Sequence, residues 1–123
     1  MGLFGKSKQE KVVVLLAKCL ELGKLDRWEE SIECCNKALE IDPDNVSAWV
    51  DKGAALGNLG RDEEAIKCCD KALEIEPGRV SAWVNNGTGL GNLGRWEEYI
   101  ECCDKVLEIE PDNASAWVNK GTG

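Results

Sequence analysis

Three segments of the chain are near copies of one another: "ECCNKALEIDPDN" (33–45), "KCCDKALEIEPGR" (67–79) and "ECCDKVLEIEPDN" (101–113). In each copy two adjacent cysteines are followed, eight residues after the second, by a proline. Metal binding, a redox relay and core packing are three interpretations of such cysteine pairs. The spacing of the copies and the sequence around them discriminate between the three.

The copies belong to a strict repeat that extends over most of the chain. Pro43, Pro77 and Pro111 are 34 residues apart, and so are three tryptophans. A fixed period of this length is typical of stacked supersecondary units, and 34 residues with helical patterning indicates paired helices. The other columns of the repeat are Trp49/Trp83/Trp117, Gly53/Gly87/Gly121, Ile32/Ile66/Ile100, Leu39/Leu73/Leu107 and Ile41/Ile75/Ile109.

The unit at residues 46–79 shows the helical pattern most clearly. Its first half, "VSAWVDKGAALGNL", is followed by Gly60, a residue suited to the left-handed end of a helix. Its second half, "RDEEAIKCCDKALEIE", has Asp62 as a candidate N-cap and apolar residues at three- and four-residue steps, and Pro77 ends it. Each unit therefore predicts two antiparallel helices, which bury their apolar faces only when a neighbouring unit stacks on them.

These residues resemble the tetratricopeptide repeat: Trp49 followed four residues later by Gly53, the small Ala65 opening the second helix, Ala72 near its end, and the closing proline. The resemblance implies an all-α fold, in which helix-turn-helix repeats stack into a right-handed superhelix, an α-solenoid. The units it implies are an N-terminal tail (1–11), three repeats (12–45, 46–79 and 80–113) and the first helix of an incomplete fourth repeat (114–123).

The first and third units depart from this pattern. Leu15 and Cys19 stand where later units have Trp and Gly, and Tyr99 replaces the small residue of the second helix. We expect the glycines of the preceding helix to leave space for Tyr99. These glycines are Gly87, Gly89 and Gly91.

The helical pattern favours core packing for the cysteines. Adjacent helical residues point about 100° apart, so the two cysteines of a pair cannot face the same way. We expect the second cysteine of each pair to be buried and the first to lie nearer the surface or at the seam between units. A zinc site needs four converging ligands, and this chain has unspaced cysteine pairs and no histidine. Metal or redox use therefore remains the minor alternative, and no metal or cofactor is expected.

Charge and composition exclude several classes of protein. The net charge of −8 disfavours nucleic acid and anionic membrane surfaces as partners. The longest apolar run, residues 12–17, is too short to span a membrane. Seven cysteines, an odd number, suit a reducing compartment, so a cytoplasmic protein is expected. The carboxylate pairs at helix starts, such as Glu63 and Glu64, complement the helix dipole, and without histidine they indicate no catalytic residue and no enzyme.

The resemblance also implies a concave groove, lined by the first helix of each unit, that binds a peptide or an extended segment of a protein partner. The groove positions are Ser47, Val50, Asp51, Ala54 and Asn58, then Ser81, Val84, Asn85, Thr88 and Asn92, then Ser115, Val118, Asn119 and Thr122. Asparagine suits a peptide backbone because its amide both donates and accepts hydrogen bonds. The alternative is that these asparagines are merely solvated surface residues.

Family members that hold acidic C-termini of chaperones use a clamp of lysines, an arginine and asparagines in this groove. The corresponding positions here carry Leu16, Leu20, Val50, Asp51 and Ser81, and Asn85 alone fits. A neutral, apolar or basic ligand is therefore expected.

The ends of the array suggest a second hypothesis, self-association. The first helix is apolar on most sides, and the sequence after Trp117 supplies no helix to cover it. Solenoids need polar caps, so bare ends indicate either a fragment of a longer array or pairing with other copies, as a dimer of like ends or a head-to-tail fibre. The residues assigned to this homo-oligomer are Val13, Leu16, Leu20 and Trp117. Replacing Trp117 by a polar residue is expected to lower any self-association.

Overall fold

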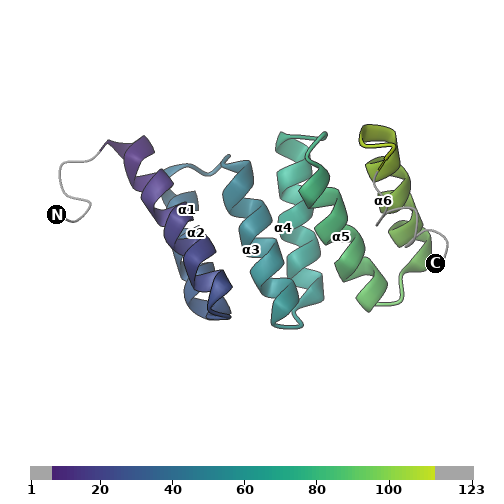
Figure 1. Ribbon diagram of the computed structural model, residues 1–123, viewed down its shortest axis with the longest axis horizontal. Coiled ribbons are helices and arrows are strands. Elements are labelled where there is room, and N and C mark those ends of the chain that lie inside the picture. Colours follow the sequence, from purple (N-terminus) through teal and green to yellow (C-terminus); the bar gives the residue numbers. More distant parts are fainter. Residues whose placement is uncertain (1–6, 113–123) are drawn as a thin grey trace.

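The protein is described by a computed structural model over residues 7–112 of its 123 residues. Antiparallel helix pairs stack in an elongated row, with α1 and α6 at opposite ends (Figure 1). The helices are α1 (Lys8–Lys24), α2 (Trp28–Ile41), α3 (Val46–Asn58), α4 (Asp62–Ile75), α5 (Val80–Asn92) and α6 (Trp96–Ile109). The expected fourth-repeat helix at 114–123 lies outside the described residues.

The start of α1 corrects the expectation of a tail at 1–11. Ser7 caps the helix: its side chain accepts a hydrogen bond from the Glu10 amide at 3.1 Å, and the Glu10 carboxylate accepts one from the Ser7 amide at 3.3 Å. This reciprocal capping box satisfies two amides that a helix start would leave unpaired. Residues 8–11 are therefore helical. Within residues 7–112, no helix is both long enough and apolar enough to cross a membrane.

The turn between the helices of each unit repeats along the chain. Gly60 and Gly94 have φ angles of 77° and 73°, and Asp26 takes the equivalent place with φ 58°. The N-cap of α4 is Arg61, not Asp62 as expected, and no side chain caps it. Instead the Arg61 guanidinium forms two hydrogen bonds, of 2.9 and 2.7 Å, with the Glu64 carboxylate one turn into the helix.

The tryptophan and proline columns have one structural explanation. The Trp49 indole N–H donates to the carbonyl oxygen of Pro43 at 2.8 Å, and the Trp83 indole makes the same bond to Pro77 at 2.8 Å. Each bond ties the loop between two units to the first helix of the next. This hydrogen bond therefore explains why each tryptophan follows its proline at the same distance along the sequence.

The apolar core is continuous from unit to unit. Ile32 of α2 lies in one cluster with Leu56 of α3 and Cys68 of α4, so that cluster spans the first and second units. Val50 of α3 joins Ala82 of α5 in the same way across the next boundary. Burial between units therefore holds the stack together.

The glycines of α5 make room for side chains of two different units. A Cβ at Gly91 would lie 3.1 Å from the Tyr99 ring, as expected. A Cβ at Gly87 would stand 3.9 Å from the Tyr99 ring, at ordinary contact distance, and closer to Cys102. At Gly89 it would instead meet Ile66 of the previous unit at 3.0 Å, so the expectation that Gly89 serves Tyr99 is wrong.

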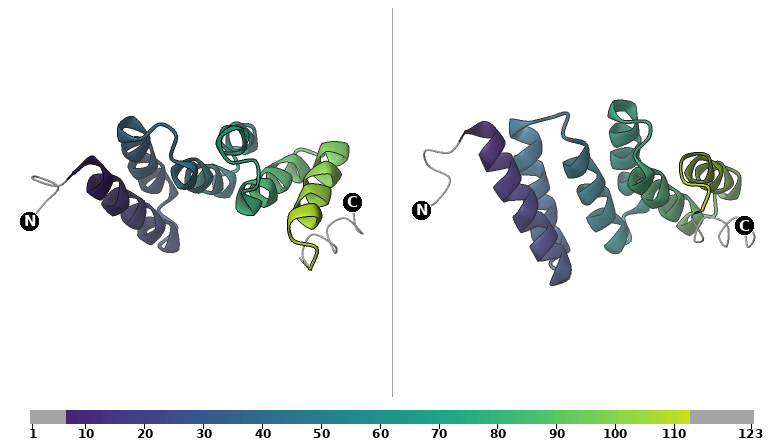
Figure 2. Two further views of the ribbon diagram at one scale, coloured as in Figure 1. Left: turned by 90° about the horizontal axis from the view of Figure 1, so that it is seen from above. Right: turned by 45° about the horizontal axis from the view of Figure 1, so that its top comes forward.

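Two layers of helices result from this stacking. The first helices of the units touch one another in sequence, α1 with α3 and α3 with α5, and form the inner layer. The second helices, α2, α4 and α6, form the outer layer and make no comparable contact with one another in the described part of the chain. Successive pairs are rotated relative to one another along the row (Figure 2).

Candidate functional site

The predicted groove positions lie on the inner layer. On α3, Asp51 and Ala54 are half-buried and Asn58 is exposed, and on α5, Thr88 and Asn92 are exposed. The structure places Ser47 and Ser81 near the beginnings of these helices. Residues Ser115, Val118, Asn119 and Thr122 lie outside the described part of the chain.

Val50 is a correction to the predicted groove. Its side chain is 6% exposed and packs against Ala72 and Ala82, so it belongs to the core. The reason is that this helix position points toward the first helix of the following unit. Val84, the equivalent residue on α5, is 41% exposed.

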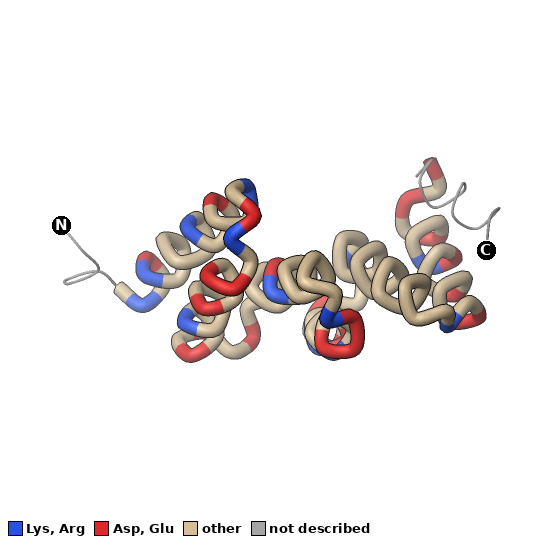
Figure 3. Tube along the Cα trace, turned by 90° about the horizontal axis from the view of Figure 1, so that it is seen from below, with Lys and Arg blue, Asp and Glu red and all other residues tan. Residues whose placement is uncertain are grey.

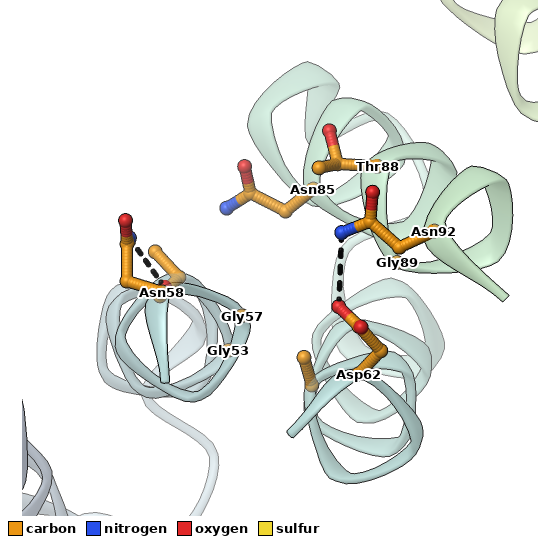
Figure 4. A pocket seen from close by; sticks show the side chains of 10 residues that line it. Gly53, Gly57, Asn58, Asp62, Asn85, Thr88, Gly89 and Asn92 are labelled. Carbon is orange, nitrogen blue, oxygen red and sulfur yellow. Dashed lines mark hydrogen bonds between the residues drawn. The ribbon is translucent and has the colours of Figure 1, made fainter. Parts of the chain in front are cut away.

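A cavity of about 300 Å³ lies between α3 and α5, with the beginning of α4 as its floor. We call it the central cavity (Figure 4). It is lined by Gly53, Ala54, Gly57, Asn58, Asp62, Ala65, Asn85, Thr88, Gly89 and Asn92. The glycines have no side chains to fill the cavity, while side-chain amides and one carboxylate are among its polar groups.

Most polar groups of the central cavity already have a partner. Asn58 Nδ2–H donates to the Ala54 carbonyl at 2.8 Å, and Asn92 Nδ2–H donates to Asp62 Oδ1 at 3.1 Å. Thr88 donates to the Val84 carbonyl at 3.0 Å. Asn85 differs, because its side-chain amide makes no hydrogen bond within residues 7–112. Its two donors and its acceptor are therefore free to bind a ligand.

A second cavity of about 240 Å³ lies one unit earlier, between α1 and α3. This N-terminal cavity is lined by Cys19, Leu20, Gly23, Lys24, Trp28, Ser31, Asp51 and Ala54. Every one of these residues stands 34 positions before a residue of the central cavity. The two cavities are thus formed by equivalent positions of successive units but carry different side chains. Trp28 occupies the position equivalent to Asp62, and Asp51 occupies the position equivalent to Asn85.

Asp51 is the polar centre of the N-terminal cavity. Burial raises the pKa of its carboxyl group, and the positive charge of Arg79 opposes that shift only in part. Within the described residues, Asp51 has no ion pair and no hydrogen bond. Trp28 forms another wall, so close to Gly23 that a Cβ there would lie 3.3 Å from the indole ring.

Arg79 is a groove residue that the sequence analysis missed. It precedes α5, and its guanidinium donates to Ser47 at 3.1 Å and to Ser81 at 3.2 Å, while also pairing with Glu76 at 3.3 Å. The hydroxyls predicted to face a ligand are therefore engaged by this arginine. Its position before the helix gave no sequence signal, because the groove pattern covers only residues inside the first helix.

The cysteines are core residues. Cys35 and Cys69 are fully buried, as expected, and Cys103 is 6% exposed. For the first cysteine of each pair we expect a place nearer the surface or at the seam between units; Cys34, Cys68 and Cys102 are all buried, at 6%, 5% and 4% exposed.

The partners of two of these cysteines explain their burial. Cys68 and Cys102 pack against Ile32 and Ile66 of the preceding unit, so they occupy the seam.

Burial also determines the protonation of these thiols. It raises the pKa of Cys69 and of Cys102 to about 12. Cys19, a cysteine outside the pairs, shares a hydrogen bond with the sulfur of Cys35; this bond lowers the pKa of Cys19 and raises that of Cys35. Among residues 7–112, no group of three or more His, Cys, Asp or Glu is placed to hold a metal ion.

The residues assigned to self-association lie partly in the groove. Leu20 is 55% exposed and lines the N-terminal cavity, and Val13, 57% exposed, occupies the α1 position equivalent to Ser47. Leu16 is half-buried against the cluster that includes Ala48 of the next unit. The face formed by Val13 and Leu20 is thus a continuation of the inner layer, and Trp117 lies outside the described residues.

Fold and site together define an α-solenoid whose inner helices carry two equivalent cavities. The sequence profile of the tetratricopeptide repeat matches residues 12–45 and 46–79, more than half of the chain. The chain therefore belongs to the tetratricopeptide repeat family. The profile of the protein prenyltransferase alpha subunit repeat matches residues 96–121. No curated protein sequence shows significant similarity to the chain.

Solved structures of the same fold resemble the chain over nearly its whole length. The Arabidopsis OM64 TPR domain superposes with a TM-score of 0.91 at 24% identity, covering 94% of this chain and 96% of that one. The first TPR of Spaghetti (RPAP3), bound to the HSP90 peptide SRMEEVD, has a TM-score of 0.90 at 26% identity, covering 92% and 90%. The second TPR domain of human RPAP3, in complex with the HSP70 peptide SGPTIEEVD, has a TM-score of 0.89 at 22% identity, covering 94% and 97%.

Proposed function

We propose that this protein is a protein-interaction module that binds an extended segment of a partner along α1, α3 and α5. The observation that carries the proposal is the free amide of Asn85 in the wall of the central cavity. A half-buried amide with both donors and its acceptor unused matches the alternating N–H and C=O groups of an extended backbone. The first TPR of Spaghetti, titled as bound to a peptide, supports this mode of binding for the fold.

The charges of the groove favour a ligand other than an acidic C-terminus. α5 carries no charged residue, and it appears as an uninterrupted neutral coil in Figure 3. The carboxylates of Asp51 and Asp62 line the two cavities, while Arg79 is engaged by Glu76 and two serines. A neutral or basic segment avoids the repulsion that these carboxylates would exert on an acidic one.

We infer that the module has no catalytic activity of its own. The chain has no histidine, and the acidic residues at the start of the outer helices have a structural role. Glu30, Glu64 and Glu98 each accept two hydrogen bonds from the arginine that precedes their helix. The buried, free cysteines agree with a reducing compartment such as the cytoplasm.

The test is selection of peptides from a random twelve-residue display library on the immobilised full chain, followed by anisotropy titration of an enriched peptide. We expect Asn85→Ala to weaken that peptide at least fivefold. Asn36→Ala, which removes an exposed amide from the outer helix α2, should leave affinity unchanged. Failure to enrich any peptide, or equal effects of the two variants, would overturn the proposal.

Self-association remains the second candidate, because α1 exposes apolar residues away from the two cavities. Val14 is 40% exposed, and Leu25, at the end of the same helix, is 61% exposed. Light scattering behind size exclusion, over a wide concentration range, tests it. A mass of 13.5 kDa at every concentration would exclude self-association, and a rise that Val14→Ser abolishes would support it.

A further inference from the structure

We infer that the N-terminal cavity binds a lysine or arginine side chain of the partner segment, with Asp51 as its counter-ion. This inference rests on the proposed function and specifies the chemistry of its ligand. It assigns different ligands to two cavities of the same design: a basic side chain to the first and neutral, hydrogen-bonding groups to the second.

The first argument concerns the carboxylate of Asp51. It is half-buried on the inner layer, within an otherwise largely apolar cavity, and it has neither an ion pair nor a hydrogen bond within residues 7–112. Desolvation, which the charge of Arg79 offsets only in part, disfavours its charged form. A cationic group entering the cavity would supply the missing partner, and it would gain a charge-assisted hydrogen bond in a partly water-excluded space.

The second argument concerns the apolar walls. The indole of Trp28 and the side chain of Leu20 line the cavity together with Ala54. An aromatic ring attracts a cation to its face, and apolar walls accept the methylene stem of a lysine or arginine. An aromatic ring and an unpaired carboxylate in the same cavity therefore both favour a cation with an aliphatic stem.

The third argument is the comparison with the central cavity, which serves as an internal reference. There the place of Asp51 is taken by the neutral Asn85, and the place of Trp28 by Asp62, whose carboxylate already accepts a hydrogen bond from Asn92. The central cavity thus lacks both the aromatic wall and the unpaired carboxylate. The preference for a basic side chain should be confined to the N-terminal cavity.

Two cations lie near the N-terminal cavity and do not satisfy Asp51. Lys24 lines the cavity but is exposed and forms no ion pair with Asp51. Arg79 acts on Asp51 only through space, since its guanidinium is held by Ser47, Ser81 and Glu76. The net charge of −8 adds a long-range attraction for a basic partner.

The experiment uses the same random twelve-residue library, panned in parallel on the full wild-type chain and on Asp51→Asn. We expect wild type to enrich peptides that share a lysine or arginine at one position, and Asp51→Asn to lose that preference. For an enriched wild-type peptide, titration should show at least a tenfold loss of affinity with Asp51→Asn and with replacement of the shared basic residue by norleucine. Trp28→Leu should cause a smaller loss.

Glu33→Gln is the matched control, because it removes one negative charge from an exposed position of the outer helix α2. It should leave the basic preference and the affinity unchanged. Enrichment of peptides without a shared basic residue, or a basic preference that survives Asp51→Asn, would overturn this inference and leave the proposed function standing. Enrichment of no peptide at all would overturn both. Equal losses of affinity with Asp51→Asn and Glu33→Gln would mean that the effect arises from net charge alone, and would also overturn the inference.

Discussion

Gly57 and Gly91 stand 34 residues apart at the same helix position, and the structure predicts opposite effects of alanine at the two sites. A Cβ at Gly57 meets nothing within 4 Å, whereas a Cβ at Gly91 would stand 3.1 and 3.3 Å from two carbons of the Tyr99 ring. That ring is also held in an edge-to-face contact with Trp96, with ring centroids 5.6 Å apart. The first site is therefore open and the second is filled.

The magnitudes follow from helix propensity and packing. Alanine in place of a helical glycine stabilises by about 0.5–1 kcal/mol where it fits. Taking about 2.1 cal/mol/K per residue for the unfolding entropy, 1 kcal/mol shifts the Tm of a 123-residue chain by about 4 °C. Gly57→Ala should therefore raise Tm by about 2–4 °C. At Gly91 the same gain is opposed by overpacking, which costs about 1–3 kcal/mol, so Tm should stay level or fall by up to about 10 °C.

Thermal and urea unfolding followed by circular dichroism, without ligand, measures both variants. The decisive comparison is Gly91→Ala in a Tyr99→Ala background, which restores the small residue found at Ala65 in the second unit. There Gly91→Ala should become stabilising, as Gly57→Ala is in wild type. An equal rise in Tm for both single variants, or no change of sign in the Tyr99→Ala background, would refute the reasoning.

Three further predictions concern stability. Leu56→Ala should cost about 3–4 kcal/mol in urea unfolding, because its side chain is 2% exposed, whereas Leu20→Ala, at 55% exposure, should cost about 0.5 kcal/mol or less. Asn45→Ala should cost about 1 kcal/mol, because the Asn45 side chain accepts a hydrogen bond from the Ala48 amide at 2.9 Å; Asn45→Asp should retain most of that stability in the same assay. The raised pKa of Asp51 means that the folded protein binds this proton more tightly than the unfolded chain. The contribution of Asp51 to the free energy of unfolding therefore falls as pH rises from about 3.9 through the folded-state pKa of this residue. Asp51→Asn should exceed wild type in stability above this window and match it below, and a constant difference across pH would contradict the assignment.

The periodic features of the sequence predicted the fold because each reports a contact made within one unit or across one boundary. The Trp49 to Pro43 spacing, for example, is that of a hydrogen bond between a loop and the helix it precedes. The start of α1 was missed because Ser7 and Glu10 fall outside the repeat. Arg61 rather than Asp62 is the N-cap of α4, and the arginine stabilises the helix start from outside through Glu64.

The site was less accessible to sequence reasoning. Single positions on the inner helices were predicted, but the N-terminal cavity joins Trp28 and Asp51, which belong to different units, so that no pattern within one unit brings them together. Val50 was assigned to the groove from the family resemblance, which does not reveal that Ala82 covers it in this chain. Pairings between units depend on how one helix pair is set against the next, and the sequence of one unit does not contain that information.

Because equivalent positions line the two cavities, ligand recognition depends on the register in which the ligand lies along the inner helices. Neighbouring helices pack about 8–10 Å apart, and an extended chain advances about 3.3 Å per residue, so successive cavities would read side chains about three residues apart. A segment shifted by one repeat in one direction would place its basic residue against Asn85, and a shift in the other direction would place its neutral residue against Asp51. The cavities differ at Trp28/Asp62 and Asp51/Asn85, so a ligand with one basic and one neutral side chain should bind in one orientation along the inner helices. Exchanging these residues between the units should reverse the order of the two side chains in the ligand that binds.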